Sequence, residues 1–265
     1  MTEPCGDLAQ CIRSSASLAI RRCAQGLLTV ETLSARIREE WEALALEENQ
    51  TTQQLLNRMA LRYCSRTLYQ VCCSSQEETH NCAFENLRRY LAQSLQNSPY
   101  ASSLMQHEDA AEDVLQMTLE IVQKACASHP PTGPDDPAAF LKWSLTILNR
   151  QTYAFVTKVE QESVSSLDAQ YEVYIEELED RCNNDPEASF DLQELQQTLS
   201  NAILSLSNKR YRQVLFGTFL AGMDERELAT LLGVQVQEVY LWRHRALKAL
   251  RSNQKVVEAL RLWLR

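Results

Sequence analysis

Glycine, proline and runs of β-branched residues are scarce in this chain, whose 265 residues include six glycines and seven prolines. Strands and the tight turns between them depend on these residues, so their scarcity argues against a β-sheet protein. Hydrophobic residues nevertheless make up 45% of the chain, which is ample for buried cores. The sequence therefore predicts an all-α fold.

Long apolar runs and targeting signals are also lacking. No stretch approaches the roughly 18 apolar residues that a membrane-spanning helix needs. The N-terminal residues 1–7 are acidic, whereas a signal peptide begins with basic residues followed by an apolar segment. We therefore expect a cytoplasmic protein without a membrane partner. In that compartment the nine cysteines would be reduced thiols, most of them small core residues.

Groupings of residues that indicate catalysis or metal binding are missing as well. The four histidines are scattered, no nucleophile lies beside a candidate base, and no phosphate-binding loop is present. The best zinc-site candidates are Cys72, Cys73, His80 and Cys82. Adjacent cysteines seldom fit one tetrahedron, and paired CxxC knuckles are lacking. We therefore expect no enzymatic activity, no metal and no cofactor.

The net charge of −9 conceals a sorting of charge along the chain. Residues 159–200 include twelve acidic residues and one arginine, whereas residues 201–265 include eleven lysines and arginines and five acidic residues. A basic C-terminal segment that follows an acidic connector fits nucleic-acid contact better than the average charge suggests.

The stretch from residue 223 to residue 250 is typical of two helices joined by a tight turn. Apolar residues recur on one side of the first helix, 225–232, and Gly233 then supplies a residue that tolerates a positive φ. The second helix starts near Gln235, and its buried face is predicted to comprise Val239, Trp242, Ala246 and Leu250. This is the pattern of a helix-turn-helix, whose second helix enters the DNA major groove.

The exposed side of that second helix would read DNA. Its candidate DNA-contacting residues are Gln235, Gln237, Glu238, Tyr240, Leu241, Arg243, His244 and Lys248. Either glutamine can pair with adenine, and Leu241 can touch a thymine methyl group. Glu238 would repel phosphate, although it can accept a hydrogen bond from a cytosine amino group. A chance helical hairpin is the alternative, and the basic residues on both sides of the pair favour DNA binding.

Further helices are predicted wherever apolar residues recur every three or four positions. They span residues 7–26, 30–48, 51–73, 84–97, 108–124, 138–158 and 186–206. The buried faces predicted for three of them are, in 30–48, Leu33, Ile37, Trp41 and Leu44; in 51–73, Leu55, Leu56, Met59, Tyr63 and Val71; and in 108–124, Val114, Leu115, Thr118, Leu119 and Val122. A polar loop over residues 74–79 separates two of them. Residues 129–137 include four prolines, so this segment cannot be helical and is expected to form a stiff loop.

Two parts of the chain resemble a bacterial RNA polymerase sigma factor of the extracytoplasmic-function type. The segment AEDVLQMT at 111–118 is similar to the family's polymerase-clamp-binding helix, and FLKWSLTILN at 140–149 is similar to its promoter-melting helix. The segments LSNKRYRQVLFGTFLAGMDERELATLLGV and HRALKAL resemble its promoter-reading C-terminal domain. The resemblance covers residues 83–158 and 185–251 and leaves the first eighty residues unmatched.

The resemblance implies that the protein binds core RNA polymerase and directs it to promoter DNA, with an anti-sigma factor as a further candidate partner. The residues implied in polymerase binding are Glu112, Asp113 and Gln116, for which an ordinary solvated face is the alternative. The residues implied in contacting the melted promoter are Phe140, Lys142, Trp143, Asn149 and Arg150. For Phe140 a place in the core is an equally good interpretation. The loop 128–137 would hold a flipped base.

The chain departs from the family pattern in two places. The arginine-asparagine pair that ends the family's melting helix is here Asn149-Arg150, displaced by one position, and the basic cluster after it is reduced to Lys158. In the recognition helix, the usual small-Thr-Val-Lys-Ser-Arg run is replaced by QEVYLW at 237–242. The helix therefore reads an unusual DNA sequence or binds DNA weakly.

We accordingly expect four segments: an N-terminal helical extension (1–80), a sigma domain 2-like segment for polymerase binding and promoter melting (81–158), an acidic linker (159–185), and a sigma domain 4-like helix-turn-helix (186–265). The predicted function is transcription initiation. Two alternatives stay open: a helix-turn-helix regulator that never binds polymerase, and a degenerate sigma-like scaffold for protein interactions. The extension either regulates the protein or supports its fold.

Overall fold

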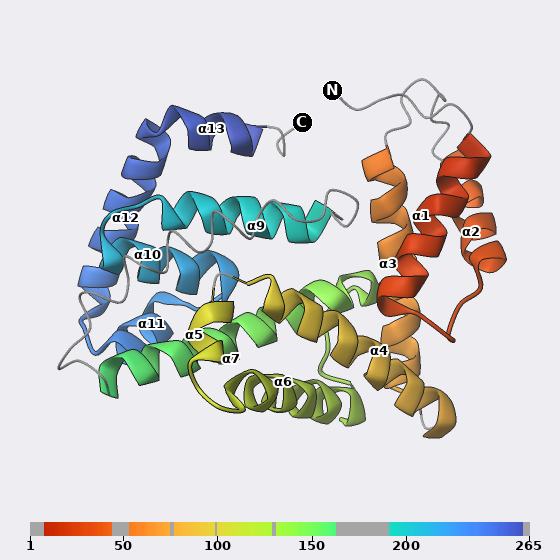
Figure 1. Cartoon of the computed structure of the whole chain (residues 1–265), viewed down its shortest axis with the longest axis horizontal. Helices are drawn as coiled ribbons and strands as arrows, with labels where there is room; N and C mark the ends of the chain where they lie inside the picture. Colours follow the sequence, from red (N-terminus) through yellow and green to blue (C-terminus); the bar gives the residue numbers. More distant parts are fainter. Residues whose placement is uncertain are drawn as a thin grey trace. The chain divides into compact units, whose positions relative to one another are not determined.

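The computed structural model describes residues 8–43, 53–74, 77–98, 100–128, 131–162 and 191–261. These residues form helices joined by short turns, and none of them is in a strand (Figure 1). The predicted all-α fold is therefore confirmed for this part of the chain. No helix within these ranges combines the length and the apolar character that crossing a membrane requires.

The chain divides into two compact units. Unit 1 comprises residues 1–94 and 118–145, and unit 2 comprises residues 95–117 and 146–265. The boundaries between them fall within, or next to the ends of, three helices: α4 (Glu77–Gln96), α6 (Ala110–Ala127) and α7 (Phe140–Glu162). Each of these three helices therefore contributes residues to both units.

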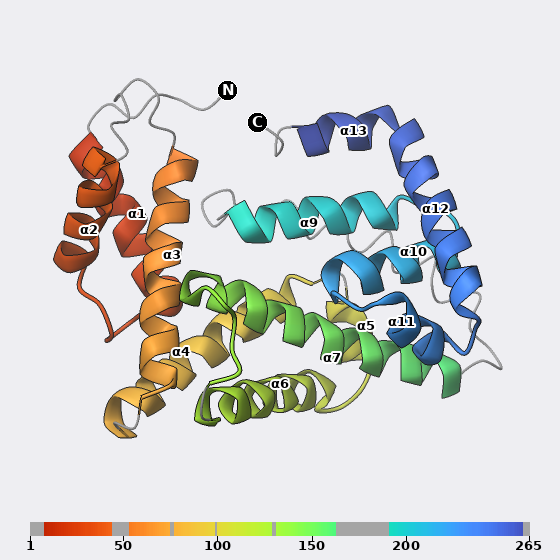
Figure 2. The ribbon, with the colours of Figure 1, turned by 180° about the vertical axis from the view of Figure 1, so that it is seen from behind.

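Unit 1 is built largely from the first eighty residues, which form α1 (Leu8–Cys23), α2 (Val30–Ala43) and α3 (Gln53–Cys72). Helix α1 packs against both α2 and α3, as both views show (Figures 1 and 2). On α2 the predicted face is confirmed for Leu33, Ile37 and Trp41, which are buried. Leu44, the fourth residue predicted for that face, lies outside the described residues.

The buried face of α3 differs from the prediction. Leu56 and Met59 are buried as expected, but Leu55, Tyr63 and Val71 are only half-buried. The core positions next to them are filled by the small or medium-sized residues Ala60, Cys64, Leu68 and Cys72. The following helix, α4, begins at Glu77, so the loop predicted over residues 74–79 is shorter than expected.

The proline-rich segment after α6 packs on α3. Gly133 lies so close to Tyr69 that a Cβ atom at this glycine would be 2.6 Å from the ring carbon Cε2. The hydroxyl of Ser65 donates to the Pro137 carbonyl at 3.3 Å and accepts from the Leu141 N–H at 3.1 Å. Helix α3 therefore holds both this segment and the start of α7, which favours a structural role for the first eighty residues.

The buried amide of Asn86 joins the end of α1 to α4. Its Oδ1 accepts from the Gln25 N–H at 2.9 Å, and its Nδ2 donates to the Gln25 carbonyl at 2.8 Å. Arg89 also donates to Asn86 Oδ1 at 2.6 Å. Asn86 is only 2% exposed, and this pairing satisfies a polar side chain that would otherwise destabilise the core.

The free cysteines of unit 1 behave mainly as small core residues. Four of them, Cys23, Cys64, Cys72 and Cys126, are buried as predicted. Burial raises the pKa of Cys72 to about 12, and a hydrogen bond with Cys23, together with burial, raises the pKa of Cys64. These two thiols are therefore protonated at neutral pH.

Unit 2 contains most of the C-terminal helices. They are α9 (Asp191–Leu204), α10 (Lys209–Leu215), the π-helical turn η3 (Phe216–Leu220), α11 (Glu225–Leu232), α12 (Val236–Ser252) and α13 (Gln254–Arg261), with the short α5 (Ala101–Met105) added from earlier in the chain. Helices α10 and α11 both pack against α12 (Figures 1 and 2). Tyr153 of α7 belongs to the same core and is 3% exposed, so the second half of α7 is an integral part of this unit.

The boundaries of α7 also bear on the predicted acidic linker. Residues 137–139 form a short 3-10 turn, and α7 then runs from Phe140 to Glu162, past the end predicted at residue 158. Residues 163–185, the remainder of the predicted linker, lie outside the described part of the chain.

We predict that Asn86→Ala destabilises unit 1, because it leaves the Gln25 N–H and carbonyl without their side-chain partner. The expected loss in the free energy of unfolding is about 0.5–1.5 kcal/mol, the usual net contribution of a hydrogen bond, because Gln25 is exposed and water can replace the lost partner. The measurement is urea denaturation followed by circular dichroism. The matched control is Asn81→Ala, at an exposed position on the same helix. Equal stability of the two variants would contradict the structural role of Asn86.

Candidate nucleic-acid interface

Helices α11 and α12 are joined by a tight turn, as the sequence predicts. A capping box starts α11: Asp224 Oδ1 accepts from the N–H groups of Arg226 and Glu227, both at 2.8 Å, and Glu227 Oε2 accepts from the Asp224 N–H at 2.9 Å. Gly233 ends the helix with a φ of 65°, which confirms the predicted positive φ. No atom lies within 4 Å of the place where its Cβ would be, so backbone conformation alone favours glycine here.

Two further features position α11 and the helix before it. A Cβ atom at Gly217 would lie 2.1 Å from Leu228 Cδ2, so η3 can approach α11 this closely only with a glycine. Helix α10 is capped by Asn208, whose side chain accepts from the N–H groups of Arg210 at 2.9 Å and Tyr211 at 3.3 Å. The local sequence therefore fixes where each helix of this group begins.

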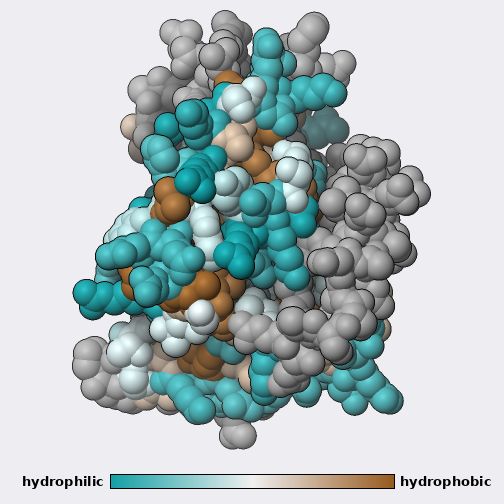
Figure 3. Space-filling view, turned by 90° about the vertical axis from the view of Figure 1, so that its left-hand side faces the viewer, coloured by the Kyte–Doolittle hydropathy of each residue, from teal (hydrophilic) through white to brown (hydrophobic). Residues whose placement is uncertain are grey.

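Helix α12 has a buried face and an exposed face, and the sequence predicts both. The buried residues are Val239, Trp242, Ala246 and Leu250, as predicted. The predicted DNA-contacting residues that are exposed are Gln235, Gln237, Glu238, Tyr240, Leu241, His244 and Lys248. Figure 3 shows the side of the molecule that includes α12, where hydrophobic residues lie among hydrophilic ones. Tyr240 and Leu241 are unusually exposed for large hydrophobic residues, at 49% and 44%.

Glu238, predicted as a DNA contact, has a local structural role. Its Oε2 accepts from the Gln235 N–H at 3.2 Å and so satisfies one of the free N–H groups at the start of α12. A carboxylate in the first turn also interacts favourably with the helix dipole. The spacing of Gln235 and Glu238 is that of a capping box, a signal already present in the sequence.

Arg243 differs from the other predicted DNA-contacting residues of α12, because it is half-buried and they are exposed. Its guanidinium forms an ion pair with Glu225 in the first turn of α11, and it lies 5.3 Å from the centre of the Tyr240 ring. Arg243 therefore joins the two helices and supports the Tyr240 ring. Arg245 and Lys248, in contrast, are exposed basic residues of α12.

The basic residues of α10 are divided between surface and core. Arg210 is exposed, and its guanidinium lies 4.7 Å from the centre of the Trp242 ring. Arg212 is 6% exposed and donates to the Leu206 carbonyl at 3.0 Å. The positive surface next to the helix pair is therefore smaller than the residue count suggests.

The predicted polymerase-binding residues lie together on the solvent-facing side of α6. Glu112, Asp113 and Gln116 are all exposed in the first two turns. Met117 beside them is 39% exposed. Val114 and Leu115 are buried, so the orientation of this helix matches the prediction.

The aromatic residues predicted to stack on melted DNA differ in their accessibility. Phe140 is fully buried, with its ring centre 5.4 Å from that of Tyr69 and 5.9 Å from that of Trp143. The ring of Phe140 therefore fills the core under α3, which agrees with the core interpretation of this residue. Trp143 is half-buried and Lys142 is exposed, so both remain candidates.

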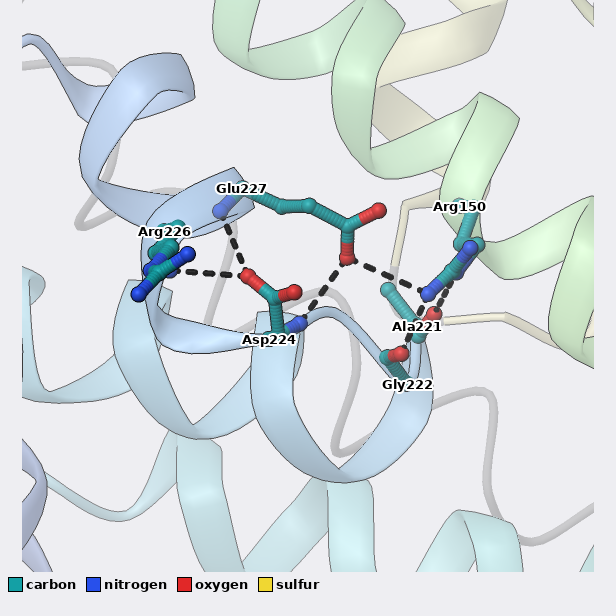
Figure 4. A network of polar contacts seen from close by, with 6 residues as sticks. All are labelled: Arg150, Ala221, Gly222, Asp224, Arg226 and Glu227. Atoms are coloured by element: carbon teal, nitrogen blue, oxygen red, sulfur yellow. Dashed lines mark hydrogen bonds and ion pairs between the residues drawn. The ribbon is translucent and has the colours of Figure 1, made fainter.

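Asn149 and Arg150, also predicted to contact melted DNA, bond instead to the corner that precedes α11. Asn149 Nδ2 donates to the Leu220 carbonyl at 3.1 Å. Arg150 donates to the carbonyls of Ala221, at 2.8 Å, and Gly222, at 2.5 Å. Its Nη2 also lies 3.2 Å from Glu227 Oε2, the atom that completes the capping box (Figure 4). These donors are thus occupied within unit 2.

The face of α7 that makes these contacts has helical spacing. A Cβ atom at Gly222 would lie 3.1 Å from Thr146 Cγ2, and the hydroxyl of Tyr153 donates to the Gln213 carbonyl at 2.9 Å. The four residues involved are Thr146, Asn149, Arg150 and Tyr153. Residues three, four and seven positions apart share one side of a helix. The sequence therefore indicates that these four residues share a face, but it does not indicate which element packs against them.

We predict that Arg150→Ala loosens the corner before α11, because three acceptors lose a charged donor. The free energy of local opening should fall by about 1–2 kcal/mol. This is less than the largest effect of a charged hydrogen bond, because the Arg150 side chain is partly solvated. Hydrogen exchange of the α10 and α11 amides measures it. The control, Arg226→Ala, removes an exposed arginine from α11 and should change stability by no more than about 0.5 kcal/mol. Unchanged protection in Arg150→Ala would show that the corner does not depend on this residue.

Comparison of the chain with protein-family models, curated proteins and solved structures found no match.

Proposed function

We propose that this protein binds DNA in a sequence-specific manner through α12 and acts as a sigma-like transcription initiation factor. One observation carries the DNA-binding part: α11, Gly233 and α12 form a helix pair whose second helix buries one face and exposes Gln237, Tyr240, Leu241, His244 and Lys248 on the other. A recognition helix needs this arrangement to enter the major groove while staying attached to its domain.

The polymerase part of the proposal rests on the resemblance to sigma factors and on α6. The exposed carboxylates and amide of Glu112, Asp113 and Gln116, with Met117 beside them, offer polar and apolar groups on one rigid helix. Such a surface suits docking on a basic protein face that has an apolar centre. Trp143 and Lys142 are the residues that would contact melted DNA.

A helix-turn-helix regulator that does not bind polymerase is the second candidate. The burial of Phe140 and the internal bonds of Asn149 and Arg150 favour it, because they reduce the surface available for melting DNA. A scaffold without DNA binding has less support than the sequence suggested. Two features of the sequence motivate it, the weak basicity of residues 149–158 and the acidic Glu238. Glu238 has a capping role in α12.

The deciding experiment mixes the purified full chain with bacterial core RNA polymerase and linear promoter-bearing genomic fragments. The proposal predicts co-elution with polymerase and transcripts with defined start sites. The matched variant Gln116→Ala should weaken co-elution, whereas Gln123→Ala, an exposed glutamine further along α6, should not. Retained DNA binding without co-elution would favour the plain regulator. Co-elution without defined starts would favour the scaffold.

We also predict that Lys248→Ala weakens binding to all DNA sequences and flattens the salt dependence of the binding constant. Removing one phosphate contact should change the slope of log K against log salt by about 1. Titrations by fluorescence anisotropy at several salt concentrations measure this slope. Lys124→Ala, which removes the same charge from the last turn of α6, should leave it unchanged. An unaltered slope in Lys248→Ala would remove this residue from the interface.

A further inference from the structure

The exposed face of α12 is a single stripe along the helix. Its members are Gln237, Tyr240, Leu241, His244 and Lys248. Their spacing of three and four residues places them on one side of the helix, opposite the buried Val239, Trp242 and Ala246. A groove of DNA that receives α12 would meet these side chains first.

The stripe changes character along its length. Its N-terminal half contains no basic residue and has an amide, a phenol ring and a leucine side chain, from Gln237 to Leu241. Its C-terminal half includes the exposed Lys248, and the exposed Arg245 and Arg251 lie near it. In helix-turn-helix proteins the N-terminal residues of the recognition helix contact base edges, while basic residues bind phosphates. The order along α12, uncharged side chains first and cations after them, is therefore the order expected of a recognition helix.

Tyr240 and Leu241 form the apolar part of the base-reading half. They are 49% and 44% exposed, and the Tyr240 ring is supported by Arg243, which Glu225 holds in turn. Thymine is the only base with a methyl group in the major groove, and apolar side chains recognise it by contact. The amide of Gln237 has the donor and acceptor that pair with adenine.

From these observations, and on the basis of the proposed DNA binding, we infer that α12 reads A·T base pairs through thymine methyl groups. Leu241 and Tyr240 are the methyl-contacting residues, and Gln237 pairs with an adenine close to those thymines. Recognition of this kind relies on apolar contact instead of arginine-guanine pairing. It also accounts for two large hydrophobic side chains on a face bordered by cations.

The test begins with the full chain and a random-sequence DNA duplex library, from which bound sequences are enriched. Each thymine of the best duplex is then replaced singly by deoxyuridine, which keeps base pairing and removes only the methyl group. We expect at least one replacement to weaken binding roughly threefold to fourfold, the effect of losing one buried methyl group. Fluorescence anisotropy measures the dissociation constants.

Variants identify the side chain responsible. Leu241→Ala or Tyr240→Ala should weaken binding to the thymine duplex and abolish the difference between thymine and deoxyuridine at one position, because the methyl group then has no partner. The control, Met105→Ala, removes a large side chain that is 65% exposed on α5. It should preserve the full difference.

The outcomes separate this inference from the proposed function. Tight binding to an enriched duplex that is insensitive to every deoxyuridine replacement overturns the inference and leaves DNA binding intact. Sensitivity that persists in both alanine variants assigns the methyl contact to other residues and also overturns it. Enrichment of no sequence overturns sequence-specific DNA binding, and the inference with it, and favours a protein partner for the Tyr240 and Leu241 surface.

Discussion

The corner between η3 and α11 leaves three successive backbone carbonyls, those of Leu220, Ala221 and Gly222, in need of hydrogen-bond donors. Asn149 and Arg150 of α7 supply them. Ala221 is buried and Leu220 is half-buried, so the loss of their donors is costly, whereas Gly222 is exposed. The contact with α7 therefore stabilises this corner. Asp224, which caps α11, follows two residues later, and the start of the helix pair therefore depends on α7.

The charged residues around α12 serve two different purposes. Glu227 completes the cap of α11 and pairs with Arg150, Glu238 caps α12, and Arg243 pairs with Glu225. These charges shape the helix pair. The other exposed cations of α12 are Arg245, Lys248 and Arg251, which the proposed DNA binding would place against phosphates. An acidic residue in a recognition helix is thus compatible with DNA binding when its carboxylate is used for capping.

The proposed initiation function places specific demands on α7. Phe140 and Tyr153 anchor it in the cores of unit 1 and unit 2, respectively, and Asn149 and Arg150 bond to the α11 corner. Among the residues implied in melting DNA, Phe140 is fully buried and the donors of Asn149 and Arg150 are engaged within unit 2, whereas Lys142 is exposed and Trp143 is half-buried. Promoter opening by this protein would therefore rely on fewer side chains than the resemblance to sigma factors implies.

Much of the helix pair could be predicted from the sequence. Gly233 and the spacing of Val239, Trp242, Ala246 and Leu250 specify the turn and the buried face, because positive φ and helical periodicity are local properties. The capping roles of Glu227 and Glu238 could also be predicted, because each lies three residues after an N-cap residue. The negative charge of Glu238 by itself suggested repulsion of phosphate.

The partners of α7 could not be predicted in this way. The sequence by itself determined the all-α fold, the ends of the helices around the turn and the stripe on α12, since these follow from composition, capping and periodicity. Only the tertiary structure decided that Phe140 packs under Tyr69 and that Arg150 bonds to the carbonyls of Ala221 and Gly222. These contacts join residues more than sixty positions apart in the sequence. The spacing of residues on a helix indicates which face is buried, but it does not indicate which element packs on that face.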